Sequence, residues 1–265
     1  MTVPRKIVPL LVEPLAPSAG AYGKAAPSAA APAAVPLLSY HGGAVIGAVE
    51  VVLVFWGAHW VQSGSAGGAV LQGQLNDFFD HILTSAFMDM LGEYSTAATQ
   101  IAHGKRLATV NVSASEPGAI IGGVRTVSDA QIQQALQEWT ANKTVPAATA
   151  NTLYFIYLPP DVVSSFQNSQ SCTAFCGYHE NAGNIFYAVE PYITCAGCSF
   201  GAILDSQTKV SSHELAEAVT DPAGAGWWDS STGDEIGDIC NASTTRLGAY
   251  LVQNQWSNAR SACVL

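Results

Sequence analysis

The sequence predicts a layered domain of the α/β or α+β class, and three observations support this prediction. Apolar, β-branched runs that end at glycine or proline recur along the chain, and segments with apolar residues at helical spacing lie between them. Beyond the last of these runs, the chain becomes irregular and rich in carboxylates and cysteines. With 265 residues, of which 49% are hydrophobic, it is long enough to bury a substantial core.

The N-terminal part differs from the rest in composition. Residues 1–38 contain an Ala/Pro/Ser-rich stretch without a hydrophobic period, which predicts a flexible leader or pro-segment. A basic pair and a short apolar run at its start suggest a signal peptide, but Pro9 interrupts the run early, so a pro-region remains an alternative. We expect a single domain over residues 39–265.

Strands and helices alternate within the predicted domain. Residues 49–57, VEVVLVFWG, form a continuous apolar run that predicts a buried strand. Helical spacing of apolar residues predicts a helix from about Gly67 to Tyr94. A second helix is expected after Ser128, because Gln131 stands where a capping box requires it. Later apolar runs predict further strands at residues 107–112, 152–159 and 184–191.

The segment SSHELAEAVTDP, residues 211–222, combines a histidine with two glutamates. Residues four apart share one face of a helix, so His213 and Glu217 can reach a single ion, as the histidines of the HExxH zinc helix do. Glu214 stands where the general base of a zinc hydrolase belongs. A structural interpretation also fits, in which Ser211 and Glu214 form a capping box and His213 and Glu217 an ordinary side-chain pair.

A dense group of carboxylates follows in GWWDSSTGDEIGDICN, residues 226–241, although only 11% of the chain is charged. Neighbouring carboxylates repel one another, and a bound cation relieves this repulsion. We therefore favour a metal site with Asp238 as the third ligand and Glu235 as the alternative. Imidazole and carboxylate ligands suit Zn2+, and the acidic loop also suits Ca2+. Asp221 is too far along the helix to share the ion, and we expect it to shape the helix exit.

The six cysteines allow two interpretations. Four of them have the spacing of a four-thiolate zinc knuckle. We favour disulfides instead, because the number of cysteines is even and the low charge suits a protein of an oxidising compartment. The expected pairs are Cys172–Cys176, Cys195–Cys198 and Cys240–Cys263. On the predicted cysteine loop, His179 and Glu180 are interpreted as polar surface residues and not as a second metal pair.

Charge and hydropathy exclude several partners. The net charge is −10 and the few Lys and Arg residues are scattered, so neither nucleic acid nor an anionic membrane surface is an expected partner. No run approaches the roughly 18 apolar residues of a membrane-spanning helix.

Several segments taken together carry a resemblance. They are YHGGAV, VEVVLVFWGAHW and FCGYHENAGNIFYAVEPYITCAGC in the first part, then HELAEAVTDP, GDEIGDIC and YLVQNQWSNARSACVL. In combination they resemble the EXORDIUM, or phosphate-induced protein, family of secreted plant cell-wall proteins, and its bacterial and fungal relatives. The resemblance covers about residues 38–265.

The resemblance implies secretion, paired cysteines and, in members that keep the HE motif, a zincin-like metallopeptidase site. The implied fold is α+β, with a twisted mixed sheet, flanking helices, an active-site helix and an irregular, disulfide-tied C-terminal region. An edge strand such as residues 184–191 would pair with the extended substrate. The implied metal ligands are His213, Glu217 and Asp238, with Glu214 as general base. Plant members largely lack these residues, and ordinary zincins have a histidine where this chain has Glu217.

We therefore expect a secreted, monomeric, zinc-dependent hydrolase, a metalloendopeptidase that acts on peptide or protein substrates. Glu214 would deprotonate the attacking water. One alternative is a non-catalytic, EXORDIUM-like extracellular protein in which the acidic cluster is a structural metal site. A less favoured alternative is a glycosidase that uses Glu214 and Asp238 as its carboxylate pair.

Overall fold

The computed structural model describes residues 10–11, 35–64, 67–113 and 116–265. Most of the predicted leader therefore lies outside the described residues. Leu38 already belongs to the folded part, because the strand β2 (Leu38–Tyr40) pairs with β12 (Trp227–Asp229) near the other end of the chain.

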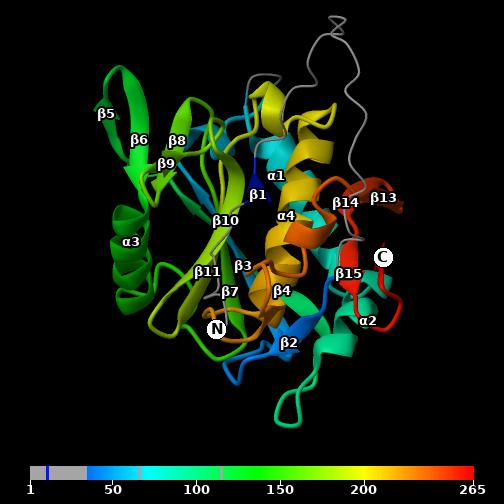
Figure 1. The fold of residues 1–265 in the computed structure, drawn as a ribbon. Helices are drawn as coiled ribbons and strands as arrows, with labels where there is room; N and C mark the ends of the chain where they lie inside the picture. Colours follow the sequence, from blue (N-terminus) through cyan, green and yellow to red (C-terminus); the bar gives the residue numbers. More distant parts are fainter. Residues whose placement is uncertain (1–9, 12–34, 65–66, 114–115) are drawn as a thin grey trace, which may run out of the picture.

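A six-stranded mixed sheet forms the centre of the fold, in the order β1-β10-β11-β7-β3-β4 (Figure 1). The four strands from β11 to β4 run parallel, and β10 and β1 are each antiparallel to their inner neighbour. Their bounds are β1 (Leu10–Leu11), β3 (Ala48–Trp56), β4 (Ala102–Val112), β7 (Thr152–Tyr157), β10 (Phe175–Ala182) and β11 (Ile185–Glu190). The predicted edge strand at residues 184–191 corresponds to β11, which lies inside the sheet. The expectation of an edge position was wrong, because β10 covers β11.

Helices cover both faces of this sheet, which explains why its central strands are apolar on both sides. Alternate residues of β3 enter two separate cores. One core packs against α1 (Ala69–Ile82), α2 (Ala86–Leu91) and α4 (Ile203–Thr220), and the other against α3 (Asp129–Ala141). The single helix expected from Gly67 to Tyr94 is divided, because the Ser85 side chain accepts a hydrogen bond from Phe87 and starts α2 anew. The capping box of Ser128 and Gln131 is confirmed.

Smaller elements complete the chain. A second sheet has the order β5-β6-β8-β9, and the C-terminal part forms two hairpins, β13-β14 and β15-β16. The strand bounds are β5 (Ala119–Ile121), β6 (Val124–Ser128), β8 (Val162–Phe166), β9 (Ser169–Gln170), β13 (Thr244–Leu247), β14 (Tyr250–Gln253), β15 (Gln255–Ser257) and β16 (Ala262–Val264). Short 3-10 helices are η1 (Ala58–Val61), η2 (Gly92–Tyr94), η3 (Ala196–Cys198) and η4 (Asp238–Cys240). This mixture of helices with parallel and antiparallel strands confirms the α+β class.

All six cysteines form disulfides. The pair Cys240–Cys263 is confirmed, but the other four cysteines pair as Cys172–Cys195 and Cys176–Cys198, so the two local pairs were wrong. The reason is the β10–β11 hairpin. The hairpin brings the segment before β10, with Cys172, and the start of β10, with Cys176, next to the segment after β11, which holds Cys195 and Cys198. Three disulfides indicate an oxidising environment.

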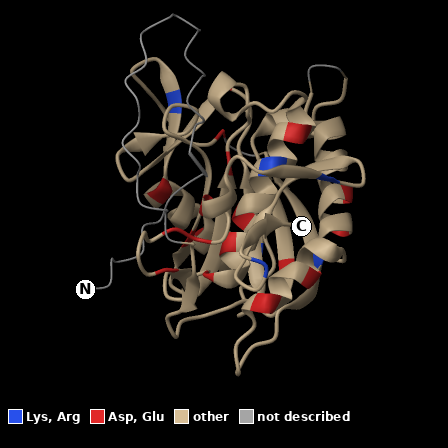
Figure 2. Cartoon of the chain, turned by 45° about the vertical axis from the view of Figure 1, so that its right-hand side comes forward, with Lys and Arg blue, Asp and Glu red and all other residues tan. Residues whose placement is uncertain are grey.

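The surface of the described chain agrees with the expected lack of a basic face. Figure 2 shows the Lys and Arg residues as isolated segments among the more frequent Asp and Glu. Within the described ranges, no helix has both the length and the apolar character needed to cross a membrane.

Candidate metal centre

The helix α4 places the predicted motif in the interior. It begins at Ile203, eight residues before Ser211, so Ser211 cannot cap it and the predicted capping box with Glu214 was wrong. The Ser211 hydroxyl instead lies 2.6 Å from the Tyr157 hydroxyl, inside the protein. The side chains of His213, Glu214 and Glu217 are completely buried. Burial of so many polar groups on one helix requires partners from elsewhere in the fold.

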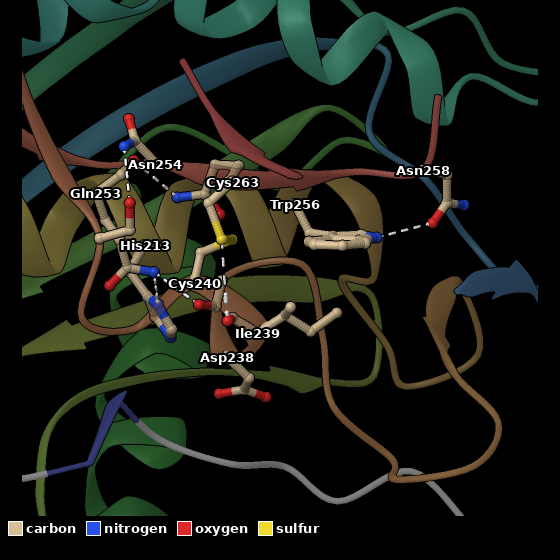
Figure 3. The surroundings of a disulfide bond; sticks show 12 residues. His213, Asp238, Ile239, Cys240, Gln253, Asn254, Trp256, Asn258 and Cys263 are labelled. Carbon is tan, nitrogen blue, oxygen red and sulfur yellow. Dashed lines mark hydrogen bonds between the residues drawn. A yellow bond between two sulfur atoms is a disulfide. The ribbon is translucent and has the colours of Figure 1, made fainter. Parts of the chain in front are cut away.

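Glu217 and a glutamine hold the ring of His213 from its two sides. Its Nε2 lies 3.2 Å from Oε1 of Glu217, and its Nδ1 lies 2.8 Å from Nε2 of Gln253 (Figure 3). The same Gln253 nitrogen donates to the carbonyl oxygen of Gly237 at 2.8 Å. Because that carbonyl can only accept, the Gln253 nitrogen must face it, and Nδ1 of His213 then accepts as well. The ring hydrogen of His213 therefore resides on Nε2, towards Glu217.

A second imidazole, His179, reaches the motif from the central sheet. It belongs to β10 and is 3% exposed, so the interpretation as a surface residue was wrong. Its Nδ1 lies 3.4 Å from Oε2 of Glu214 and 3.5 Å from Oε2 of Glu217. Its Nε2 lies 3.6 Å from Oε1 of Glu235, whose side chain is completely buried. His179 thus contacts both glutamates of the helix and one of the acidic segment.

The acidic segment approaches the helix through Asp238. The backbone amide of Asp238 donates to Oε1 of Glu217 at 3.2 Å, and Oδ2 of Asp238 accepts from the amide of Glu235 at 3.0 Å. Gly237 lets the two elements come this close, since a Cβ atom at that position would overlap the His213 ring. Asp221 is elsewhere: it ends α4, and its Oδ1 accepts from the amide of Gly226 at 2.7 Å. It shapes the helix exit, as expected.

Two groups of side chains in this cluster have donor atoms close enough to share an ion, within 4.8 Å of one another. One is His213, Glu217 and Asp238, which is the predicted ligand set. The other is His179, Glu214 and Glu217. Glu217 belongs to both, with Oε1 towards His213 and Oε2 towards His179. The structure thus brings all the predicted site residues together and adds His179.

The protonation of the carboxyls follows from this arrangement. Burial raises the pKa of Glu217, but attraction to His213 and hydrogen bonds from both imidazoles outweigh it and lower the pKa to about 2. Burial also raises the pKa of Glu214, against the opposing effect of the two histidines. The pKa of Asp238 is raised well above its usual range by burial and by the charge of Glu217. One carboxylate that favours the ionised form therefore lies beside two that tend to hold protons.

The cysteines provide no competing metal site. The sulfurs of Cys172, Cys195 and Cys198 lie close together, but all three belong to disulfides. A disulfide sulfur carries no thiolate charge, and the thiolate is the form that binds zinc. The four-thiolate knuckle is therefore incompatible with the oxidised chain.

Sequence reasoning missed His179 and Gln253. The separation of His179 from Glu214 by 35 residues has no local pattern, and only the pairing of β10 into the sheet brings the two together. The signal available was the dipeptide of His179 and Glu180 within an apolar context. A comparison with protein-family models and with curated proteins finds no match to this chain.

Proposed function

We propose that this protein is a secreted, zinc-dependent metallopeptidase, related to the EXORDIUM-like proteins that its motifs resemble. The observation that carries the proposal is the environment of Glu217, whose two carboxylate oxygens face two different imidazoles in a fully buried cluster. We assign His213, Glu217 and Asp238 as ligands. One nitrogen and two carboxylate oxygens with an open fourth position form a donor set that zinc accepts.

Two features of the cluster support a bound cation. The carboxyl groups of Glu214, Glu217 and Asp238 gather with two imidazoles in one cluster, and a bound cation relieves the mutual repulsion of crowded carboxylates. In addition, Oε1 of Glu214 is buried without a hydrogen bond among the described residues. Buried polar atoms are rarely left in this state, and ligation of an ion satisfies them.

Ligation by His213 requires one rearrangement. Its Nε2 must lose the hydrogen it carries here, so that Nδ1 holds it instead. Gln253 must then turn its amide to present Oε1, which is buried without a hydrogen bond in this arrangement, and this turn gives up the hydrogen bond from its nitrogen to the Gly237 carbonyl. A second residue that accepts from Nδ1 is the usual partner of a metal-bound histidine.

When bound, zinc would polarise a substrate carbonyl and lower the pKa of a water molecule. Glu214 lies next to the ligand His213, and its raised pKa suits a group that accepts a proton from water and later returns it to the leaving amine. His179 acts on Glu214 as a positioning residue, because its Nδ1 lies 3.4 Å from Oε2 of that glutamate.

A second candidate is a non-catalytic protein with a structural metal. It is favoured by the complete burial of Glu214, which a substrate has to reach in an enzyme. No observation favours the glycosidase alternative in the same way.

Metal analysis combined with one substitution separates these functions. Protein purified without chelator should contain about one zinc per chain. Glu214→Gln should keep that zinc and lose casein cleavage by about 10²-fold or more. Glu138→Gln, on the exposed side of α3, is the matched control and should keep both the zinc and the cleavage. Zinc with undiminished cleavage in Glu214→Gln contradicts the mechanism, and zinc without any cleavage in the wild type supports the structural metal.

The ligand set is tested in the same preparation. Asp238→Asn should lower the zinc content, whereas His179→Asn should leave it bound and reduce cleavage. The reverse result would assign the metal to His179, Glu214 and Glu217.

A further inference from the structure

The outer edge of the central sheet, next to the candidate metal centre, is occupied by the chain's own leader. The strand β1 pairs antiparallel with β10, with Leu10 opposite Gly177 and Leu11 opposite Phe175. In the sheet order β1 lies outside β10, which is otherwise the terminal strand. Figure 1 shows β1 beside β10 and α4. Residues from the start of the chain thus complete a sheet in which the next strand along the sequence, β3, begins only at Ala48.

This edge position is adjacent to the proposed general base. A Cβ atom at Gly177 would lie 3.2 Å from Oε1 of Glu214, so the backbone of β10 at this residue lies close to that carboxylate. His179, which contacts Glu214, stands two residues further along the same strand. Leu10, the leader residue opposite Gly177, is therefore paired at a point where β10 lies close to Glu214.

Pairing at a sheet edge depends on backbone amides and carbonyls, so an edge strand accepts extended polypeptide of varied sequence. The leader can pair with the edge through its backbone only over a short stretch. Pro9 and Pro14 bracket residues 10–13, and proline lacks the amide hydrogen that a longer ladder needs. A short ladder is weak for a free peptide but effective for a tethered segment, whose effective concentration is on the order of 1 mM.

We propose that the leader is a built-in competitor at this site. Its residues 10–11 occupy the β10 edge to which an extended polypeptide substrate binds, so the intact chain is self-blocked, and displacement of the leader opens the edge. The cleavage part of this inference rests on the proposed metallopeptidase function, whereas the occupation of the edge does not depend on it.

The test uses the full chain with Leu10→Pro and Leu11→Pro combined, which removes two backbone donors from β1. Leu10→Ala with Leu11→Ala is the matched control, because it changes the side chains and keeps the donors. The probe is a fluorescein-labelled peptide with the sequence of residues 6–13, KIVPLLVE. Three quantities are measured: deuterium uptake of residues 174–178, peptide binding by fluorescence anisotropy, and casein cleavage.

In the proline variant, we expect faster deuterium uptake at residues 174–178, which saturating peptide reverses. For a free-peptide Kd of about 100 µM and an effective leader concentration of about 1 mM, the variant should bind the probe about tenfold more tightly than wild type. The alanine control should behave as wild type. Casein cleavage should rise in the proline variant in parallel with probe binding.

Equal uptake and equal probe binding in wild type and proline variant would overturn the inference, whatever the cleavage rates. If uptake and binding change as expected but no form of the protein cleaves casein, the leader occupies the edge and the metallopeptidase function is wrong. If all forms cleave casein equally and deuterium uptake is unchanged, the protein is a peptidase but the leader does not block the edge.

Discussion

Replacing Glu190 with glutamine should make the stability of the protein much less dependent on pH. Glu190 ends β11 with a completely buried carboxyl group. Burial and the nearby Glu214 raise its pKa well above the usual range of a glutamate, and Ser211 opposes this only in part. The folded protein therefore keeps a proton on Glu190 at pH values where the unfolded chain has released it. Glutamine has nearly the same shape and stays neutral at every pH.

The magnitude follows from proton linkage. A carboxyl with a raised folded pKa contributes stability that is fully present below its unfolded pKa and is lost as the pH rises towards the folded pKa. The loss is about 1.4 kcal/mol per pH unit, hence at most about 2.7 kcal/mol between pH 5 and pH 7. Glu190→Gln should therefore match the wild type near pH 4.5 and exceed it in unfolding free energy by an amount that grows towards pH 7.

Urea unfolding at pH 5, 6 and 7, followed by tryptophan fluorescence in the presence of EDTA, measures this difference. Asp77→Asn is the control, because Asp77 is exposed on α1 and its replacement should leave the pH profile unchanged. Parallel stability profiles for wild type and Glu190→Gln would refute the reasoning, since they would mean that the buried carboxyl does not differ in proton affinity between the folded and unfolded states.

Three further predictions concern the candidate metal centre and its surroundings. Gly237→Ala keeps an allowed backbone conformation, with φ −81°, but its Cβ would overlap His213. Zinc affinity, measured by competition with a chelator, should therefore fall by about tenfold or more. An unchanged affinity would contradict this contact. Asp221→Ala leaves the amide of Gly226 without its acceptor and should cost about 1–3 kcal/mol in urea unfolding, with the zinc content unchanged; loss of zinc would show that Asp221 belongs to the centre. Treatment with EDTA should lower the thermal midpoint of unfolding more at pH 8 than at pH 5, because ionised carboxylates repel one another once the cation is removed. An equal shift at the two pH values would argue against a cation in the cluster.

The elements predicted correctly are those whose pattern is complete within a few residues. The strands β3, β7 and β11 are buried on both faces and hence continuously apolar, and α3 carries its capping box in sequence. The strand β10 was not predicted, because FCGYHENA combines a glycine and polar residues with its apolar ones. What makes it a strand is pairing with β11, and that pairing also sets the cysteine partners.

The residues of the candidate site also divide into those that local spacing predicts and those that only the tertiary fold brings together. His213, Glu214 and Glu217 share one helix, so their spacing predicts their proximity directly. Asp238 joins them through a backbone hydrogen bond to Glu217, an approach that the carboxylate composition suggested but could not locate. His179 comes from a different strand, and its position depends on sheet register. Local spacing therefore predicts one side of the cluster, and the tertiary fold supplies the other.

The disulfides connect these separately supplied parts. Cys176 precedes His179 by three residues on β10, and its partner Cys198 lies just before the start of α4. Cys240 follows Asp238 by two residues and is bonded to Cys263. The strand that brings His179 to α4 and the turn that brings Asp238 there are thus each covalently held close to that side chain. Metal and catalytic sites require positioning within about 0.5 Å, and a nearby cross-link limits the relative motion of its elements. The oxidation that stabilises the fold therefore also fixes the geometry around Glu217.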